Sequence, residues 1–266
     1  MSKKKTLKVI ELFAGVGGFR LGLEKASKSF NIIWSNQWEP STKTQAASEI
    51  YVKNFGENGH SNENISLVAT KDIPEHDILC GGFPCQPFSI AGYRKGFDDK
   101  DRGDLIFNII EIIKTKQPKV IFLENVKNLY SHDKGETYSY IKELIKKQGY
   151  FVKEKVLNTM EYANLPQNRE RLYIVGFKNK DEHSNFEFPK PQKLTQKLTD
   201  ILEKTEVDNY YYYNDKPLFE KIKNDIIKEY TEINPLIITE NILEDYLGKS
   251  KINYKTIHKK DMVGIV

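Results

Sequence analysis

The chain has 266 residues, 39% of them hydrophobic and 29% charged, a composition typical of a globular protein with one large domain, or one large and one small. Its net charge of +4 permits a phosphate-backbone partner, while the lack of any run near 18 apolar residues, or of a signal-peptide core, argues against a membrane. Two cysteines without a nearby His pair form neither a metal motif nor a disulfide framework, so we expect a cytoplasmic protein without a metal.

The N-terminal segment has the pattern of strand, glycine turn and helix. Residues 8–13 form an apolar run typical of a buried strand, and residues 19–26 have helical apolar spacing. This order is typical of a nucleotide-binding unit, but Arg20 occupies the place of the third glycine of the dinucleotide fingerprint, which disfavours a nicotinamide site. The turn instead allows the amino-acid or sugar part of a ligand to approach the backbone. A plain tight turn remains the alternative.

A second strand is predicted at residues 31–35, and polar residues follow it. They lie about 20 residues after the glycine turn, where such folds place a ribose-binding side chain. Gln37 or Glu39 could accept ribose hydroxyls, and Trp38 could stack on adenine. Alternatively, Trp38 is a core residue and Glu39 a solvated cap. A helix is predicted from Ser41 to Phe55, and residues 62–65 should close a third short strand near an adenine edge.

Residues 77–89 contain the candidate nucleophile. Asp77 to Cys80 has the pattern of a buried strand, and two glycines and a proline then lead to Cys85. A cysteine in a Gly/Pro-rich turn just past a strand is placed as a nucleophile is in an α/β fold, although a free cysteine is often an ordinary small core residue. Residues 92–103 carry charges among three glycines, as loops that close over substrates do.

A second polar pair follows another strand. After a predicted helix at 104–116, the strand at 120–123 is followed directly by Glu124 and Asn125. Because a charged group is costly to bury without a task, Glu124 is expected at the same carboxyl edge of the sheet as Cys85. A buried structural carboxylate is the alternative.

The last part of this region carries two arginines. A helix is predicted at 137–148 and strands at 150–157 and 172–177. Arg169 and Arg171 point the same way in an extended chain and could bind a carbonyl oxygen or a phosphate, or form a salt bridge at the rim. Glycine becomes rare after about residue 185, so we assign 1–184 to a catalytic domain and 185–266 to a linker and a partial recognition region.

Together these motifs resemble those of the cytosine-C5 DNA methyltransferases of bacterial restriction–modification systems. The resemblance covers Leu7 to Phe177, with motifs at residues 13–18, 82–89, 124–126 and 167–171 in the order of the family. It implies an α/β fold with a Rossmann-like, mostly parallel sheet, and S-adenosylmethionine as the cofactor. The residues implied to bind this cofactor are Phe13, Gly15, Gly17, Gly18, Gln37, Trp38, Asn64, Ile65, Pro84 and Leu105.

The resemblance also implies the chemistry. The Cys85 thiolate would add to C6 of a cytosine flipped out of duplex DNA, while Glu124 acts at N3 and Asn125 helps to fix the base. Arg171 would hold the O2 carbonyl, and Arg169 would orient the loop or a phosphate. Cys80 fits none of these roles and is predicted to belong to the strand core.

The sequence departs from the family pattern in two respects. Gln37 and Asn64 stand where the family commonly has acidic residues, although amides can still form hydrogen bonds. The family's C-terminal arginine-containing segment and Gly-Asn motif are not found, which suggests a truncated enzyme or one completed by a second chain. A remnant that only binds nucleic acid and an RNA cytosine methyltransferase are the alternatives.

Overall fold

The computed structural model describes residues 6–40, 42–84, 105–202 and 205. The chain divides into two compact units, Met1–Leu198 and Thr199–Val266. No helix within the described ranges is long and apolar enough to cross a membrane. The predicted loop at 92–103 and Cys85 itself lie outside these ranges, as do residues 206–266 of the predicted recognition region.

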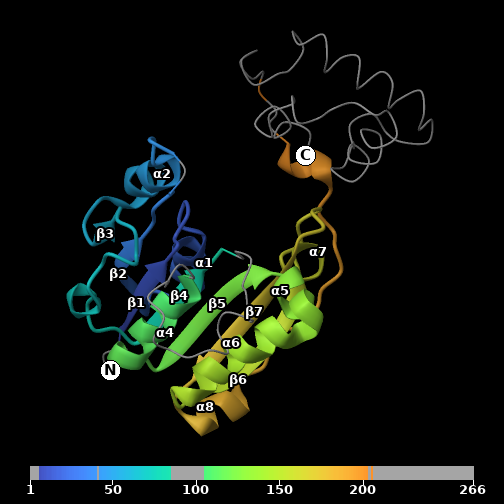
Figure 1. The fold of residues 1–266 in the computed structure, drawn as a ribbon. Coiled ribbons are helices and arrows are strands. Elements are labelled where there is room, and N and C mark those ends of the chain that lie inside the picture. The colour runs from blue at the N-terminus through green and yellow to red at the C-terminus, as the bar shows by residue number, and fades with distance from the viewer. Residues whose placement is uncertain (1–5, 41, 85–104, 203–204, 206–266) are drawn as a thin grey trace, which may run out of the picture. The chain divides into compact units, whose positions relative to one another are not determined.

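The first unit is built on a seven-stranded sheet (Figure 1). Its order is β3-β2-β1-β4-β5-β7-β6, with β3, β2, β1, β4 and β5 parallel and β7 antiparallel to both of its neighbours. This arrangement confirms the predicted mostly parallel α/β fold. The strands are β1 (Leu7–Leu12), β2 (Phe30–Asn36), β3 (His60–Ser61), β4 (Ile78–Gly82), β5 (Val120–Val126), β6 (Phe151–Asn158) and β7 (Glu170–Phe177).

Helices and short 3-10 turns lie between these strands, and α8 and α9 follow the last of them. In chain order they are α1 (Gly18–Ala26), α2 (Ala46–Phe55), η1 (Thr70–Asp72), α4 (Leu105–Lys116), α5 (Asn128–Ser131), η2 (His132–Gly135), α6 (Glu136–Lys147), α7 (Thr159–Tyr162), α8 (Lys180–Asn185) and α9 (Leu198–Ile201).

Three predicted boundaries differ from the structure by three residues or more, and the others differ by at most two. The helix predicted to start at Ser41 begins at Ala46, because the Gln45 side chain bonds back to the backbone N–H and carbonyl of Glu39 and holds the preceding residues as a loop. The third strand ends at Ser61, directly before residues 62–65. The strand predicted to end at Leu123 continues to Val126, because pairing with β7 continues to its end.

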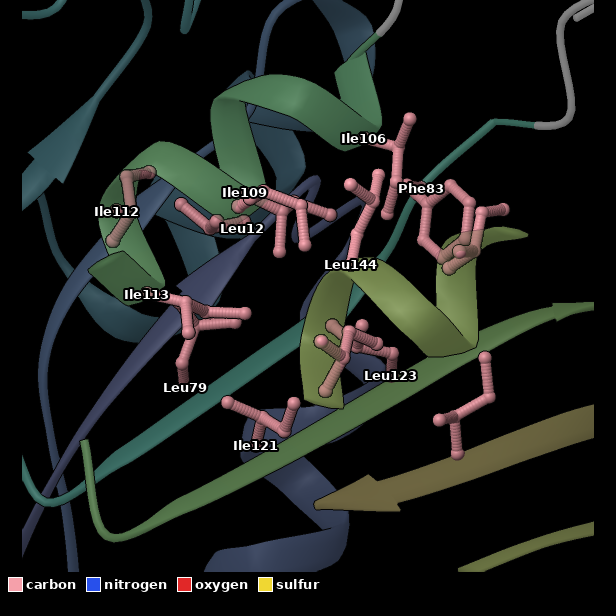
Figure 2. Packing of buried hydrophobic residues seen from close by; sticks show 14 of the residues in the cluster. Leu12, Leu79, Phe83, Ile106, Ile109, Ile112, Ile113, Ile121, Leu123 and Leu144 are labelled. Atoms are coloured by element: carbon pink, nitrogen blue, oxygen red, sulfur yellow. The ribbon is translucent and has the colours of Figure 1, made fainter. Parts of the chain in front are cut away.

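The main core lies between the sheet and the helices α4 and α6. Alternate residues of the central strands point to this side and meet one apolar face of each helix. Figure 2 shows the side chains of α4 packed over those of β1, β4 and β5. The labelled residues are Leu12, Leu79, Phe83, Ile106, Ile109, Ile112, Ile113, Ile121, Leu123 and Leu144.

The opposite face of the sheet has a smaller cluster under α1. Val9, Ile78 and Cys80 form its buried part, with Phe19 and Phe122 packed against them. Cys80 is fully buried, as predicted for a residue of the strand core. An apolar cavity of about 680 Å³ lies over the same face of the sheet. It extends from Leu23 on α1 to Phe186 and Phe188, which follow α8.

Close packing between the two antiparallel neighbours β5 and β7 generates a test of the fold. A Cβ on Gly176 would lie 2.6 Å from the buried Ile121 side chain, closer than real contacts allow. We expect Gly176→Ala to lower the free energy of unfolding by about 1–3 kcal/mol. The control Gly22→Ala, where a Cβ meets nothing within 4 Å in α1, should stabilise the protein by about 0.5–1 kcal/mol. Urea denaturation would measure both, and equal values would contradict the packing.

Candidate active site

The glycine turn between β1 and α1 has a backbone that favours glycine. Phe13, Gly15 and Gly17 have φ angles of 53°, 56° and 94°. A Cβ on Gly17 would lie 2.3 Å from the Phe55 ring, so a side chain there would collide. A Cβ on Gly15 or Gly18 would meet nothing within 4 Å. The turn therefore combines a constrained backbone with open space beside it.

The polar residues after β2 support this turn. The Gly15 N–H donates to the Gln37 side-chain oxygen at 2.8 Å, which leaves the Gln37 amide group with N–H donors for a ligand. Trp38 is 38% exposed, so the alternative that it is a core residue is wrong. Glu39 accepts a hydrogen bond from the Ala47 N–H in the first turn of α2 at 3.3 Å, so it caps this helix as the alternative predicted, but it is half-buried rather than solvated.

Three other predicted cofactor residues lie around the main core. The Asn64 side-chain oxygen accepts the Ser66 N–H at 3.0 Å and shapes the turn after β3. Ile65 is 4% exposed and belongs to the core, while Leu105 begins α4 and is half-buried against the same core. Their contact with a cofactor remains a prediction.

A buried carboxylate that the sequence analysis did not single out lies behind the glycine turn. Glu11 is 1% exposed, and its side chain accepts the backbone N–H groups of Phe19 (3.2 Å) and Arg20 (3.4 Å) and the Tyr51 hydroxyl (3.4 Å). Burial raises the pKa of Glu11 to about 7, although these hydrogen bonds partly oppose the shift. A charged residue inside an apolar strand was the signal that could have identified it.

The ends of β4, β5 and β7 bring a second carboxylate to the carboxyl edge. Gly82 pairs with Glu124, and a Cβ on Gly82 would lie 3.3 Å from a Glu124 oxygen. The Arg171 Nε atom lies 3.0 Å from the other Glu124 oxygen, and both side chains are about one-fifth exposed. Because β7 runs antiparallel, its beginning lies beside the end of β5. The structure thus brings Glu124 and Arg171 together.

Asn125 connects β5 to the segment that leads to the predicted nucleophile. It is 2% exposed, and its side-chain N–H donates to the Phe83 carbonyl at 2.8 Å. Its side-chain oxygen accepts the Val126 N–H at 2.8 Å. Pro84 is exposed at the end of the described segment, and Cys85 follows it outside the described residues.

Arg169 is not drawn into this cluster by any described ion pair. It is exposed before β7, where its backbone N–H donates to the Gln167 carbonyl and its own carbonyl accepts the Thr159 N–H. The neighbouring Glu170 pairs with Lys127 at 2.7 Å. The two arginines therefore differ, since Arg171 points to the carboxyl edge and Arg169 lies in the loop beside it.

Comparisons with known proteins identify a family. The family model of C-5 cytosine-specific DNA methylases matches residues 7–263. Type II methyltransferase M.Bsp6I of Bacillus sp. (strain RFL6) is 43% identical over 82% of this chain and 70% of its own length. Type II methyltransferase M.HhaI of Haemophilus parahaemolyticus is 46% identical over 74% of this chain and 57% of its own length. The crystal structure of S. pombe Dnmt2 methyltransferase matches 81% of this chain and 66% of its own, with 25% identity and a TM-score of 0.61.

The burial of Glu11 predicts a pH dependence of stability. Between the ordinary pKa of 4.5 and about 7, the folded protein binds more protons at Glu11 than the unfolded chain does. The free energy of unfolding contributed by this group therefore falls as the pH rises through this window. Glu11→Gln should remove this loss. Above pH 7 the free energy of unfolding of the variant should therefore exceed that of the wild-type protein by up to about 3 kcal/mol.

Denaturant titrations at pH 5 and pH 8 would measure this difference. Glu24→Gln, which removes an exposed carboxylate of α1, is the matched control and should change stability equally at both pH values. A Glu11→Gln protein whose stability follows the wild-type pH profile would contradict the burial of an ionisable carboxyl.

Proposed function

Because the chain belongs to the C-5 cytosine-specific DNA methylase family, we propose that it transfers a methyl group from S-adenosylmethionine to C5 of a cytosine in a specific duplex DNA sequence. The observation that carries this proposal is the strand register that sets Glu124, paired with Arg171, beside the end of β4, from which the chain leads to Cys85. The role would be the modification activity of a restriction–modification system.

The cofactor pocket is proposed at the glycine turn. The open space at Gly15 and Gly18 admits the amino-acid part of a ligand against the backbone. The Gln37 amide can donate to a ribose hydroxyl, and the exposed Trp38 ring can stack on adenine. When bound, S-adenosylmethionine supplies an electrophilic methyl group on a sulfonium.

Cys85 is proposed as the nucleophile because cytosine C5 alone is too weak a nucleophile to accept the methyl group. A bond from the Cys85 sulfur to C6 would push an electron pair to C5 and make C5 nucleophilic enough to accept the methyl group that S-adenosylmethionine supplies, with S-adenosylhomocysteine as the leaving group. Loss of the C5 proton and release of the sulfur from C6 restore the aromatic ring and the thiolate. The target base must leave the stacked duplex for these groups to reach it.

Glu124 is proposed to stabilise the ring during this addition. As a hydrogen-bond partner at N3, its carboxyl group would absorb the charge that sulfur attack drives into the base. Arg171 holds this carboxyl at 3.0 Å and has further N–H groups that could bind the O2 carbonyl. Asn125 would hold the segment before Cys85 in place through its hydrogen bond to the Phe83 carbonyl, in addition to helping to fix the base.

DNA is favoured over RNA as the substrate because the relatives named as Type II methyltransferases share 43% and 46% identity with this chain. The chain covers 70% and 57% of the lengths of these two relatives. Completion by a second chain is part of the proposal, and restoration of activity by such a chain would test it. Competition between duplex DNA and RNA of the same sequence would separate the two substrates.

The two cysteines provide a test of the nucleophile. We expect Cys85→Ala to lower the transfer of labelled methyl groups to mixed-sequence duplex DNA by more than about 1,000-fold. Cys80→Ala should retain most of the transfer, because the Cys80 thiol is buried in the sheet. Equal loss in both variants would contradict the assignment. If the wild-type chain shows no transfer, co-expressed chains would be screened for one that restores it.

The carboxylate at the strand end provides a second test. Glu124→Gln keeps the shape of the side chain but removes its charge and its acid function, so turnover should fall by roughly 100- to 1,000-fold. The control is Glu170→Gln, which removes a neighbouring carboxylate that pairs with Lys127 at the surface. Single-turnover kinetics would compare them, and a Glu124→Gln protein as active as this control would contradict the role.

A further inference from the structure

The mechanism proposed above leaves the buried Glu11 carboxyl without a role. It lies on the α1 side of the sheet, since β1 alternates and Ile10 and Leu12 face the opposite core. Its acceptors are filled by the Tyr51 hydroxyl and by the Phe19 and Arg20 N–H groups in the first turn of α1. A carboxyl is thus placed directly behind the glycine turn.

This placement changes the electrostatic character of the turn. The N-terminus of a helix carries about half a positive charge on its unpaired N–H groups, which suits a phosphate and disfavours a cation. Glu11 accepts two of these N–H groups in α1 and adds a negative charge of its own when it is ionised. The end of α1 therefore presents to the turn a field suited to a positively charged ligand.

No described Lys or Arg forms an ion pair with Glu11. The charge of Arg20 acts on Glu11 through space and lowers its pKa. The Arg20 guanidinium, however, donates to the Tyr51 hydroxyl at 3.3 Å, pairs with Glu24 at 2.8 Å and lies over the Phe55 ring at 4.5 Å. The other titratable groups around Glu11 favour their neutral forms. Burial raises the pKa values of the Tyr51 hydroxyl on α2 and of the Cys80 thiol on β4, the strand paired with Glu11.

Among the described residues, His60 is the remaining titratable group near Glu11, and it lies against the Tyr51 ring. Its ring stacks on Tyr51 at 4.7 Å and shares hydrogen bonds of 2.8 Å with Ser35 and Ser48. Burial lowers the pKa of His60, which favours the neutral ring. Among these described neighbours only Arg20 carries a positive charge that acts on the ionised Glu11, and it does so without an ion pair. A cation bound at the turn would add a second.

We propose that Glu11 is a positioning residue that makes the glycine turn prefer the cationic sulfonium of S-adenosylmethionine over the neutral thioether of its demethylated product, S-adenosylhomocysteine. The inference rests on the proposed function and adds to it a basis for releasing the product. Glu11 does not touch the ligand and acts through the backbone of α1 and through its charge.

Ionisation of Glu11 and binding of the cationic ligand are thermodynamically linked, so the proposal predicts a pH dependence of binding. A cation near Glu11 lowers the pKa of this carboxyl from its raised value of about 7, and the ionised carboxyl in turn strengthens binding of the cation. Preference for the sulfonium should therefore increase as the pH rises through 7. A difference of half to one pKa unit between the two complexes corresponds to roughly a threefold to tenfold change in preference.

The experiment is calorimetric binding of both ligands to the full chain, without DNA, at pH 6 and pH 8. We expect the ratio of the two dissociation constants to shift toward S-adenosylmethionine by roughly threefold or more at pH 8 in the wild-type protein. Glu11→Gln, which keeps the shape and one acceptor, should lose this shift, whereas Glu24→Gln on the exposed side of Arg20 should keep it.

Two results would overturn the inference, and they can be told apart. A shift of the same size in Glu11→Gln and wild-type proteins would assign the pH dependence to the ligands and remove the role of Glu11, while leaving the proposed function in place. Absence of binding by both ligands to the wild-type protein would overturn the proposed function and this inference together.

Discussion

The pairing of β5 with a parallel strand on one side and an antiparallel strand on the other is the constraint on which the candidate site depends. Parallel β4 brings Gly82, at the end of its strand, beside Glu124. Antiparallel β7 brings Arg171, at the beginning of its strand, to the same edge. Without the reversal of β7, the arginine would lie at the far end of the sheet, and Glu124 would lack its partner.

Two glutamates on one sheet illustrate how surroundings determine the use of the same side chain. Glu11 is buried without a described ion pair, and its charge is costly enough to raise its pKa to neutrality. Glu124 is partly exposed and paired with Arg171. Glu11 is suited to a long-range electrostatic interaction with a charge at the glycine turn, and Glu124 is suited to direct contact with a base. The two carboxylates therefore belong to separate steps of one proposed reaction.

The sequence predicted the strands, the glycine turn and the polar edge, because apolar runs and glycines report local structure directly. It did not predict where β5 ends, since that depends on register with a strand far along the chain. The loop before α2 depends on the bonds between Gln45 and Glu39, which override helix propensity. Glu11 was missed because the glycine motif beside it carried the stronger pattern, and Cys85 lies beyond what the structure describes.

The contact between Gly17 and the Phe55 ring has a consequence for the entropy of binding. The ring closes one side of the turn, while the Gly15 N–H donates to the Gln37 side chain and the Ala14 N–H to the carbonyl of Asn36, the last residue of β2. A loop fixed in this way before a ligand arrives loses little conformational freedom on binding. Such pre-organisation offsets weaker individual contacts, so we expect the proposed cofactor pocket, with an amide at position 37 in place of the acid of the family pattern, to retain its affinity through rigidity.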